Sequence, residues 1–517
     1  MAGAAPRPLW LGMEEPMALG ASPAVNLALS TRIKSAGARY QRIAISWRSL
    51  APTRPANPAD LTSPGPTNAT GIGAYRNSAV SSVDDVLRAA ADKRPSTGAG
   101  LEPLLVVEDA PDWAQNPGRP KCPTSKTDPN REFCRFPGTW SPKPDELAKF
   151  VQALATRYDG SGRFNLWDRL LPKVTWFQAW NEPNLSTHLT PQRRGRSLVG
   201  PGIYRGILSA FRKGLADAGR TDAKVVAAGM APFGNPVGVR EGTSPQRFAR
   251  AVLCLRYVKA RRGGKVLAKL PRCAPASFDV WSQHPYDLVG SPDREVDYDL
   301  QNGLLPDLPG FRAMLNTATK LGTVTPSGRK PLWITEFDWW TNPPNRILGK
   351  SQRTVATWTT DSLFRAWRAG VDTLFWFRTR DVPGWPGGLW LASDYVANPR
   401  TWGPRTYLTP GRLTPADIAA DRPKPALTSF TWPFRTVTGP RPWAWGIVPC
   451  RSSGVSVAVQ RQVARRWVNA AKGVSSASGV FTAALPRSAR GVGIWRAVVT
   501  SAPAACGGAS PTWTAKR

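Results

Sequence analysis

Short apolar runs alternate with helix-like segments along roughly the first 430 residues of the chain. The runs are rich in β-branched and aromatic residues, which is typical of buried strands. Between them, apolar residues recur at three- and four-residue steps, as in residues 81–93 and 354–370, and this period predicts amphipathic helices. Eight strands are predicted, over residues 9–13, 40–46, 104–108, 174–179, 224–229, 278–282, 331–335 and 373–377.

The alternation of strands and helices predicts a parallel sheet with helical crossovers. Eight such units close most simply into a (β/α)8 TIM barrel of the α/β class, which we expect to span residues 1–435. The loops after the second, third, fifth and eighth predicted strands are long and rich in Pro, Gly and Trp. Because the loops after the strands build the active face of such a barrel, their length predicts a deep cleft there.

The pattern changes near residue 439, where the helical period gives way to alternating strands. Four runs, over residues 454–463, 465–473, 479–485 and 492–500, are separated by Gly, Ser and Pro turns. They predict a small C-terminal antiparallel β-sandwich over residues 440–517. Its tryptophans could stack on sugar rings, although alternating Trp in strands is more often core; they are Trp443, Trp445, Trp467 and Trp495.

Composition limits the classes of partner. The 517 residues are 41% hydrophobic, and no run approaches the roughly 18 apolar residues that a membrane span needs. The 69 Lys and Arg outnumber the 35 Asp and Glu, which gives a formal net charge of +34. These basic residues are dispersed, with only short clusters near residues 193–196 and 259–262, so nucleic acid is not expected as a partner. An anionic cell-envelope polymer stays open as one, and the chain is expected to be a monomer.

The six cysteines fall into three neighbourhoods along the sequence. Pairing by proximity predicts three disulfides, among fifteen connectivities that six cysteines allow: Cys122 with Cys134, Cys254 with Cys273, and Cys450 with Cys506. Disulfides imply an oxidising compartment, so a secreted or envelope-associated protein is expected; six free thiols in a cytosolic protein are the alternative. The opening residues show no basic segment followed by an apolar run, so no signal peptide is expected in this chain.

No metal or other cofactor is expected. The cysteines show no CxxC spacing, and the chain has only two histidines, His188 and His284, so a zinc site is disfavoured. No Gly-rich phosphate loop is present, and neither histidine has a nucleophile motif near it.

Two glutamates follow strands of the predicted barrel. Glu182 lies in the run Trp180-Asn181-Glu182-Pro183 after the fourth strand, and Glu336 ends the seventh strand in PLWITEFDWW. The carboxyl ends of strands four and seven face each other across the mouth of an eight-stranded barrel. A carboxylate pair in that position predicts glycosidic cleavage, in which one acid protonates the leaving oxygen and the other attacks or activates water.

With these residues, the region of residues 8–430 resembles the clan A retaining glycoside hydrolases. The WNEPNL run, the APDWA segment at residues 110–114, the Ile334-Thr335-Glu336 segment and the C-terminal sandwich are most similar to glycoside hydrolase family 39, with family 5 as the close competitor. The resemblance implies that Glu182 is the general acid/base and Glu336 the nucleophile.

The resemblance also implies roles for residues around this pair. Asn181 would hydrogen-bond the sugar 2-hydroxyl, Arg42 would hold the nucleophile ionised, and Trp376 would be the platform under the cleaved sugar. His284 and Tyr286 would border the nucleophile. Each has a plainer alternative, for Arg42 a barrel-core ion pair, for His284 a satisfied core histidine and for Trp376 packing.

Further side chains are candidates for the active face. Glu14, Trp47 and Trp113 are expected to contact the substrate. Other acidic residues are expected to bind sugar hydroxyls or to order loops; they are Glu15, Glu108, Asp109, Asp338 and Asp381.

The sequence leaves the substrate open. The chain continues after WNEPNL with Ser186-Thr187-His188-Leu189-Thr190, which departs from the usual family 39 continuation on the leaving-group side. We expect a plant or microbial poly- or oligosaccharide to be cleaved by double displacement. The alternatives are a transglycosylase on the same site and a non-catalytic barrel that binds anionic envelope polysaccharide.

Overall fold

Eight parallel strands close into a barrel in the computed structural model, which describes residues 6–61, 77–121, 136–161, 170–234, 242–261, 263–287, 290–295, 302–501 and 506–515. The strands follow one another around the barrel in chain order, and the last pairs with the first. This confirms the predicted (β/α)8 fold, with each strand within about two residues of its predicted place. The barrel strands are β1 (Trp10–Glu14), β2 (Tyr40–Ser46), β3 (Glu102–Glu108), β4 (Trp176–Ala179), β7 (Lys224–Met230), β11 (Val280–Gln283), β13 (Leu332–Ile334) and β16 (Val371–Phe377).

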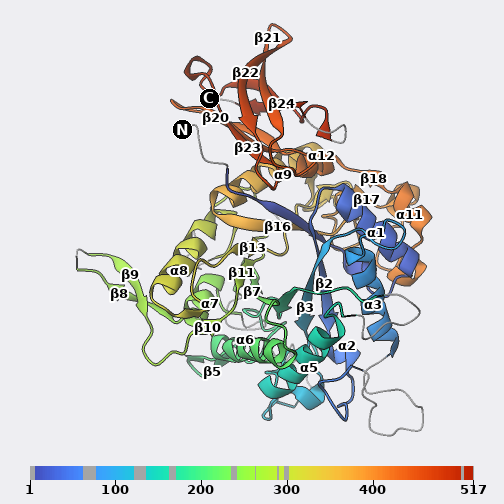
Figure 1. Cartoon of the computed structure of the whole chain (residues 1–517), viewed down its shortest axis with the longest axis vertical. Helices are drawn as coiled ribbons and strands as arrows, with labels where there is room; N and C mark the ends of the chain where they lie inside the picture. Colours follow the sequence, from blue (N-terminus) through green and yellow to red (C-terminus); the bar gives the residue numbers. More distant parts are fainter. Residues whose placement is uncertain are drawn as a thin grey trace.

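Helices surround the barrel and bury their apolar faces against it (Figure 1). Several begin with a proline in the first turn, where the missing N–H costs nothing, and Ser22 and Ser351 cap two of them through their side chains. The helices are α1 (Pro23–Ser35), α2 (Trp47–Leu50), α3 (Asn77–Ala91), α5 (Pro144–Arg157), α6 (Gly200–Asp217), α7 (Pro245–Val252), α8 (Leu308–Lys320), α9 (Gln352–Arg368), α10 (Ser393–Ala397), α11 (Pro415–Ala420) and α12 (Pro425–Thr431).

Short two-stranded pairs lie outside the barrel. The longest is the hairpin of β8 (Leu255–Lys259) and β9 (Lys265–Lys269), which projects from the side of the molecule beyond α8 (Figure 1). The others are β5 (Arg193–Arg194) with β6 (Ser197–Leu198), β10 (Ala276–Ser277) with β12 (Val324–Thr325), β14 (Thr341–Asn342) with β15 (Lys350–Ser351), and β17 (Trp390–Leu391) with β18 (Arg422–Pro423).

A layer of large side chains fills the barrel toward the amino-terminal ends of its strands. Tyr40 packs against Trp333 with ring centroids 5.4 Å apart, and Trp333 packs against Trp176 at 4.8 Å. The same buried cluster contains Leu104 and Phe375. This packed layer fills the interior of the barrel toward the amino-terminal ends of its strands.

The chain ends in two antiparallel sheets that share a second core, as predicted. One has the order β19-β20-β23 and the other β22-β21-β24-β25. β19 begins before the domain boundary that we expected at residues 435–440, because it pairs with β20. The strands are β19 (Phe434–Val437), β20 (Trp443–Ile447), β21 (Ser456–Val463), β22 (Arg466–Val474), β23 (Val480–Ala484), β24 (Gly493–Ser501) and β25 (Trp513–Ala515).

Aromatic contacts join the sandwich to the barrel beside α9 and α12 (Figure 1). Trp443 and Trp445 of β20 both pack against Phe364 and Trp367 of α9, at centroid distances of 5.5 to 6.0 Å. Trp495 is fully buried in the sandwich core. These three tryptophans therefore serve packing and not sugar stacking, in line with the expectation for Trp in alternating strands.

Two of the three predicted disulfides are confirmed. Cys254 and Cys273 join the two ends of the segment that carries the β8–β9 hairpin, with Cα atoms 5.6 Å apart, and Cys450 bonds to Cys506 in the sandwich. Cys122 and Cys134 lie outside the described residues. Among the helices of the described segments, none is long and apolar enough to cross a membrane.

Candidate active site

A cleft of about 910 Å³ opens at the carboxyl ends of the barrel strands. Its walls come from the strand ends and from the loops that follow them, as the long loops predicted. The side chains that carry chemistry there are Glu14, Arg42, Glu108, Asn181, Glu182, His188, Tyr286, Glu336, Arg378 and Trp385.

The chain leaves β4 through a sharp turn that aims Glu182 into this cleft. Trp180 and Glu182 both have positive φ angles, 69° and 40°, which are uncommon for residues other than glycine and persist only where the surroundings hold them. The Trp180 N–H donates to the carbonyl of Val107 at 3.1 Å, and the Glu182 N–H donates to the carbonyl of Gly229 at 3.0 Å. Neighbouring strands β3 and β7 thus fix the backbone on both sides of the carboxylate.

The loop beyond Glu182 is fastened from inside. Asn184 is fully buried, accepts a hydrogen bond from the N–H of Ala231 at 3.0 Å and donates to the carbonyl of Thr243 at 3.2 Å. Asn184 is therefore a structural residue of the WNEPNL run.

Glu182 and Glu336 meet around His284. One carboxylate oxygen of each glutamate and one ring nitrogen of the histidine lie within 4.8 Å of one another. His284 Nδ1 lies 3.0 Å from Glu182 Oε1, and Nε2 lies 3.0 Å from the hydroxyl of Thr335 and 3.7 Å from Glu336 Oε1. The three groups span a distance that a metal ion could bridge, but both ring nitrogens already have hydrogen-bonding partners, one of which a metal would displace.

His284 is neutral in this setting. Burial lowers its pKa to about 4, against the opposing effect of Glu182. A neutral imidazole has one donor and one acceptor nitrogen. With Glu182 ionised, Nδ1–H donates to the carboxylate and Nε2 accepts from Thr335, so the ring orients Glu182 without adding charge.

One buried guanidinium organises the rest of the site. Arg42 Nη1 lies 2.6 Å from Glu336 Oε1 and also bonds Glu14, Nη2 donates to Asn181 Oδ1 at 2.8 Å, and Nε donates to Gln178 Oε1 at 3.2 Å. Burial alone would lower the pKa of Arg42, but Glu14 and Glu336 outweigh it and raise that pKa, so the charge is permanent. Arg42 therefore places a permanent positive charge directly against the carboxylate of Glu336.

The second acid at Arg42 does not compete for its charge at neutral pH. Burial, followed by the charge of Glu336, raises the pKa of Glu14 to about 8 against the opposing effect of Arg42. Glu14 is then largely protonated at pH 7, and the guanidinium charge is left to Glu336. Tyr286 completes the surroundings of Glu336, because its phenol donates to Oε2 at 3.0 Å. Burial and the nearby Glu336 raise the pKa of Tyr286 well above its usual range, so it remains a donor.

Three predicted tryptophans are not in the cleft. Trp376 is 1% exposed, donates its indole N–H to the carbonyl of Gly387 at 2.8 Å and packs edge-on against Phe337 and Phe430. The prediction that it is the sugar platform is wrong, because neighbouring residues of a strand point to opposite faces and Phe377, not Trp376, lines the cleft.

Trp47 and Trp113 are corrected in the same way. Trp47 is fully buried and stacked on Phe150, with centroids 5.2 Å apart and planes at 10°. Trp113 packs edge-on against Trp47 and donates its indole N–H to the carbonyl of Ala51 at 2.9 Å. Both indoles join loop segments to the helical layer and lie outside the cleft lining.

Sequence reasoning missed Trp385, an aromatic side chain that lines the cleft. Trp385, in the Gly- and Pro-rich loop after β16, meets Tyr286 and Phe377 edge-on at 5.5 and 5.3 Å. Its indole N–H donates to Asp338 Oδ2 at 2.5 Å. A Cβ at Gly387 would lie 1.9 Å from that same oxygen, so the loop can pass Asp338 only as glycine. The Gly-Trp-Pro-Gly-Gly composition was the one signal for this loop.

Asp338 also differs from an ordinary carboxylate. It is fully buried beside Trp385, and burial raises its pKa to about 8. Asp338 therefore anchors the indole as a largely neutral acid at pH 7 and does not act on substrate, in line with the expectation that it orders a loop.

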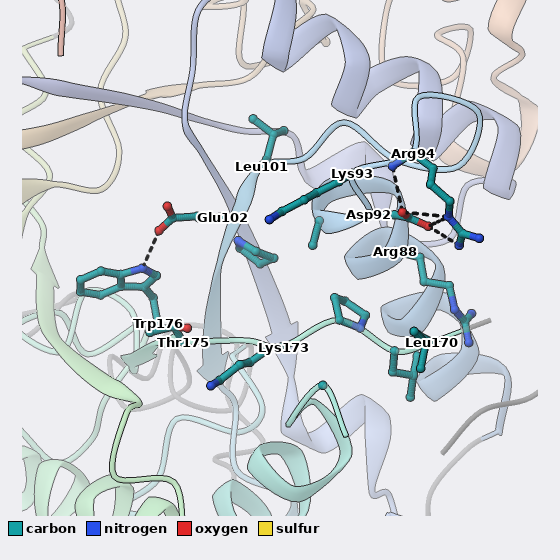
Figure 2. Close-up of a pocket in the computed structure, with 15 residues that line it drawn as sticks. Arg88, Asp92, Lys93, Arg94, Leu101, Glu102, Leu170, Lys173, Thr175 and Trp176 are labelled. Atoms are coloured by element: carbon teal, nitrogen blue, oxygen red, sulfur yellow. Dashed lines mark hydrogen bonds and ion pairs between the residues drawn. The ribbon is translucent and has the colours of Figure 1, made fainter. Parts of the chain in front are cut away.

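A second cavity, of about 830 Å³, lies at the opposite end of the barrel (Figure 2). Its two carboxylates are already engaged. Asp92 pairs with Arg94 at 2.6 Å, and Glu102 pairs with Arg39 at 2.6 Å and accepts from the indole of Trp176 at 3.2 Å. The cavity does not lie at the carboxyl ends of the strands, where barrel enzymes have their active sites, and its described lining has no pair of acids that face each other. The cleft is therefore the better candidate for an active site.

No family model matches the sequence, and no curated protein matches it. Solved structures are similar to it at low identity. A family 39 glycoside hydrolase from the gut symbiont Bacteroides cellulosilyticus WH2 is 13% identical, with 93% of this chain and 81% of that chain covered and a TM-score of 0.46.

Two further solved structures have similar values. SrfJ from Salmonella typhimurium is 10% identical, with 93% and 90% covered and a TM-score of 0.44. A GH5-4 broad specificity endoglucanase from Clostridium acetobutylicum is 13% identical, with 74% and 91% covered and a TM-score of 0.40. At such values the side chains of the cleft, and not these likenesses, carry the functional assignment.

Proposed function

We propose that this protein is a retaining glycoside hydrolase that cleaves an O-glycosidic bond by double displacement. The observation that carries the proposal is the pair Glu182 and Glu336, which project from the ends of β4 and β13 with carboxylate oxygens within 4.8 Å of each other. Retaining enzymes hold their two carboxyl groups about 5 to 5.5 Å apart, whereas inverting enzymes need about 6.5 to 9.5 Å to admit a water. The short separation favours direct attack by one carboxylate.

Glu336 is the nucleophile in this proposal. Its oxygens are held by Arg42 at 2.6 Å and by the phenol of Tyr286 at 3.0 Å. Attack on the anomeric carbon forms a glycosyl-enzyme ester while the glycosidic C–O bond breaks. The two donors orient the carboxylate for attack and hydrogen-bond it again when it leaves.

Glu182 is the general acid and then the general base. Its protonated carboxyl gives a proton to the departing oxygen, and the resulting carboxylate later takes a proton from the water that attacks the ester. Asn181, held through Oδ1 by Arg42 at 2.8 Å, keeps its amide N–H groups for the sugar 2-hydroxyl.

The sugar platform in this proposal is Trp385 with Phe377. Their rings lie 5.3 Å apart in the cleft wall, and the indole is anchored by Asp338. An apolar ring face flanked by polar side chains suits a sugar of a plant or microbial poly- or oligosaccharide. Glu14, as a largely neutral acid, can donate a hydrogen bond to a sugar hydroxyl or accept one from it.

The test is the stereochemistry of the first product. Aryl glycosides with good leaving groups, pyranosides and furanosides, would be screened with the parent, and the anomer released at early times would be followed by proton NMR. Retention of configuration is expected. Inversion would overturn the mechanism, and turnover of no glycoside at all would overturn the assignment as a hydrolase. Added sugar acceptors distinguish hydrolysis from transglycosylation on the same site.

A second role is favoured by the β8–β9 hairpin, which we propose binds an anionic polymer of the cell envelope. Residues 242–278 contain nine Lys and Arg and no Asp or Glu. The hairpin projects from the barrel, is closed at its base by Cys254–Cys273, and exposes Tyr257 and Val266, each about half. An excess of positive charge along one segment attracts polyanions.

Binding to polygalacturonate at low and high salt tests the hairpin. Lys259→Glu, Lys265→Glu and Lys269→Glu together should abolish binding, whereas the same charge change at exposed Arg465, Arg466 and Lys472 of the sandwich should not. Equal loss in both variants would mean that only net charge matters. This role presupposes export, for which the disulfides are the support, and a chain that acts as a monomer.

A further inference from the structure

His188 lies between two glutamates at the rim of the cleft. Its Nε2 is 3.4 Å from Glu182 Oε2, and its Nδ1 is 3.6 Å from Glu108 Oε2. Glu108 is the last residue of β3. Its Oε2 is buried and has no hydrogen-bonding partner among the described residues. The imidazole is thus the group that faces Glu108, and it connects the ends of two neighbouring barrel strands.

The backbone holds this ring in place. The carbonyl of His188 accepts the indole N–H of Trp180 at 2.8 Å, and its own N–H donates to the carbonyl of Leu185 at 3.1 Å. Trp180 is fully buried and stands two residues before Glu182. One short loop therefore carries the acid, its aromatic support and the histidine, so the His188–Glu182 contact follows from the loop's own fold.

Each of the two carboxyl oxygens of Glu182 faces one of the two histidines of the chain. The buried His284 takes Oε1, and His188, whose side chain is 28% exposed, takes Oε2. In the proposed mechanism Glu182 must both donate and accept a proton, and this proton must bind to one of its two carboxyl oxygens. Because His284 is neutral and enclosed, exchange is left to the Oε2 side, where His188 meets the open cleft.

We propose that His188, oriented by Glu108, is a positioning residue that shares the catalytic proton of Glu182. The proton on Nε2 of the imidazolium passes to Glu182 Oε2, so that an N–H bond breaks and an O–H bond forms. Glu182 then protonates the departing oxygen. When water opens the glycosyl-enzyme, Glu182 takes a proton and returns it to His188, so no proton is gained or lost over the cycle.

The charges around His188 support this arrangement. Burial alone would lower its pKa, but the nearby carboxylate of Glu108 and the charges of Glu182 and Glu336 outweigh it and raise the pKa to about 9. Asp109 and His284 are further titratable groups that interact with it electrostatically. His188 is therefore an imidazolium at neutral pH, with a proton available beside the acid/base carboxylate.

The inference rests on the proposed hydrolase function, and kinetics test the two together. His188→Gln cannot titrate, and His188→Phe removes both nitrogens. Each should lose about tenfold to a hundredfold in kcat/KM on glycosides with poor leaving groups, which need the proton, and little on activated aryl glycosides. The basic limb of the pH profile should move to lower pH. Equal loss on both substrate types with an unmoved limb would mean that His188 only supports the loop.

A titration that needs no turnover separates the two hypotheses. The chain has only two histidines, so the ring resonances of His188 in a histidine-labelled sample are assigned by their loss in His188→Gln. The parent should titrate well above 7 at His188, and Glu108→Gln and Glu182→Gln should each lower that value by at least one unit. Glu102→Gln, at the other end of β3, is the control and should change nothing.

A His188 that titrates near 6.5 and ignores Glu108 and Glu182 would overturn the inference even if the parent cleaves glycosides. A parent that cleaves no glycoside would instead overturn the proposed function, and the titration would still decide whether the Glu108–His188–Glu182 array exists.

Discussion

Arg42 Nη1 lies 2.6 Å from Oε1 of Glu336, and the same guanidinium reaches Asn181 and Gln178 through its other nitrogens. A residue of the second strand therefore contacts both Glu336, at the end of the seventh strand, and the amide of Asn181 beside Glu182. The planar fork of arginine is what allows one side chain to serve all of these partners.

Replacing Arg42 by Lys should thus lower activity although the charge is kept. An ammonium cannot reach Glu336, Asn181 and Gln178 together, so we expect kcat/KM on aryl glycosides to fall at least about tenfold. Arg39→Lys, in a half-exposed pair with Glu102, is the control and should retain parental activity. Parental kinetics in Arg42→Lys would show that the fork does not matter.

Replacing Trp385 by Ala should affect substrate binding, whereas replacing Trp376 by Ala should affect stability. Trp385→Ala removes a cleft wall, so KM for an oligosaccharide substrate should rise about tenfold, equal to about 1.4 kcal/mol. Trp376→Ala empties a core site, so the free energy of unfolding should fall by about 3 to 5 kcal/mol. Denaturant melts and Michaelis kinetics on both variants decide this. A KM effect at Trp376 without loss of stability would restore it as the platform.

Stability should decrease as the pH rises from about 4 to about 8. Glu14 and Asp338 have pKa values of about 8 in the folded chain, above their usual 4.5 and 3.8. In that window the folded state binds more protons than the unfolded state, so the free energy of unfolding falls with pH.

Asp338→Asn isolates one of these two groups. At pH 5 the variant should match the parent, because a protonated acid and an amide make similar contacts. Toward pH 8 it should lose less stability, with the slope reduced by up to one proton, about 1.4 kcal/mol per pH unit. Denaturant melts across this range are the measurement, and parallel curves for the two proteins would contradict the buried, protonated Asp338.

Non-reducing peptide mapping tests the cysteine pairing. Links Cys254–Cys273 and Cys450–Cys506 are present in the structure, and Cys122–Cys134 stays a prediction from proximity in the sequence. We expect all three linked peptides and no free thiol. A free Cys122, or a link from Cys134 to another pair, would remove part of the argument for export.

The barrel and its carboxylate pair were predictable because both depend on strand order. Apolar runs locate strands, and consecutive parallel strands with helical crossovers leave few topologies. A glutamate at the end of strand four and another at the end of strand seven must then face each other. The roles of Arg42 and Tyr286 were implied by the resemblance to clan A glycoside hydrolases, and each residue lies in or just after a strand.

Side-chain direction and loop structure were not predictable in the same way. The run LFWF at residues 374–377 has no polar residue to set the phase of the strand, so which of Trp376 and Phe377 faces the cleft was undetermined. Trp385 lies in a loop without periodicity, and the His188–Glu108 contact joins a loop residue to the end of a strand 80 positions earlier. Such contacts are set by tertiary packing.

The assignment of Glu336 as nucleophile and Glu182 as acid/base is tested most directly by the configuration of the azide product in Ala variants. Glu182→Ala should still form the glycosyl-enzyme from an activated aryl glycoside, and azide should release it as a glycosyl azide of retained configuration, because azide needs no general base. Glu336→Ala should turn over no activated glycoside in this way. A retained glycosyl azide from Glu336→Ala, with Glu182→Ala inactive, would reverse the two roles.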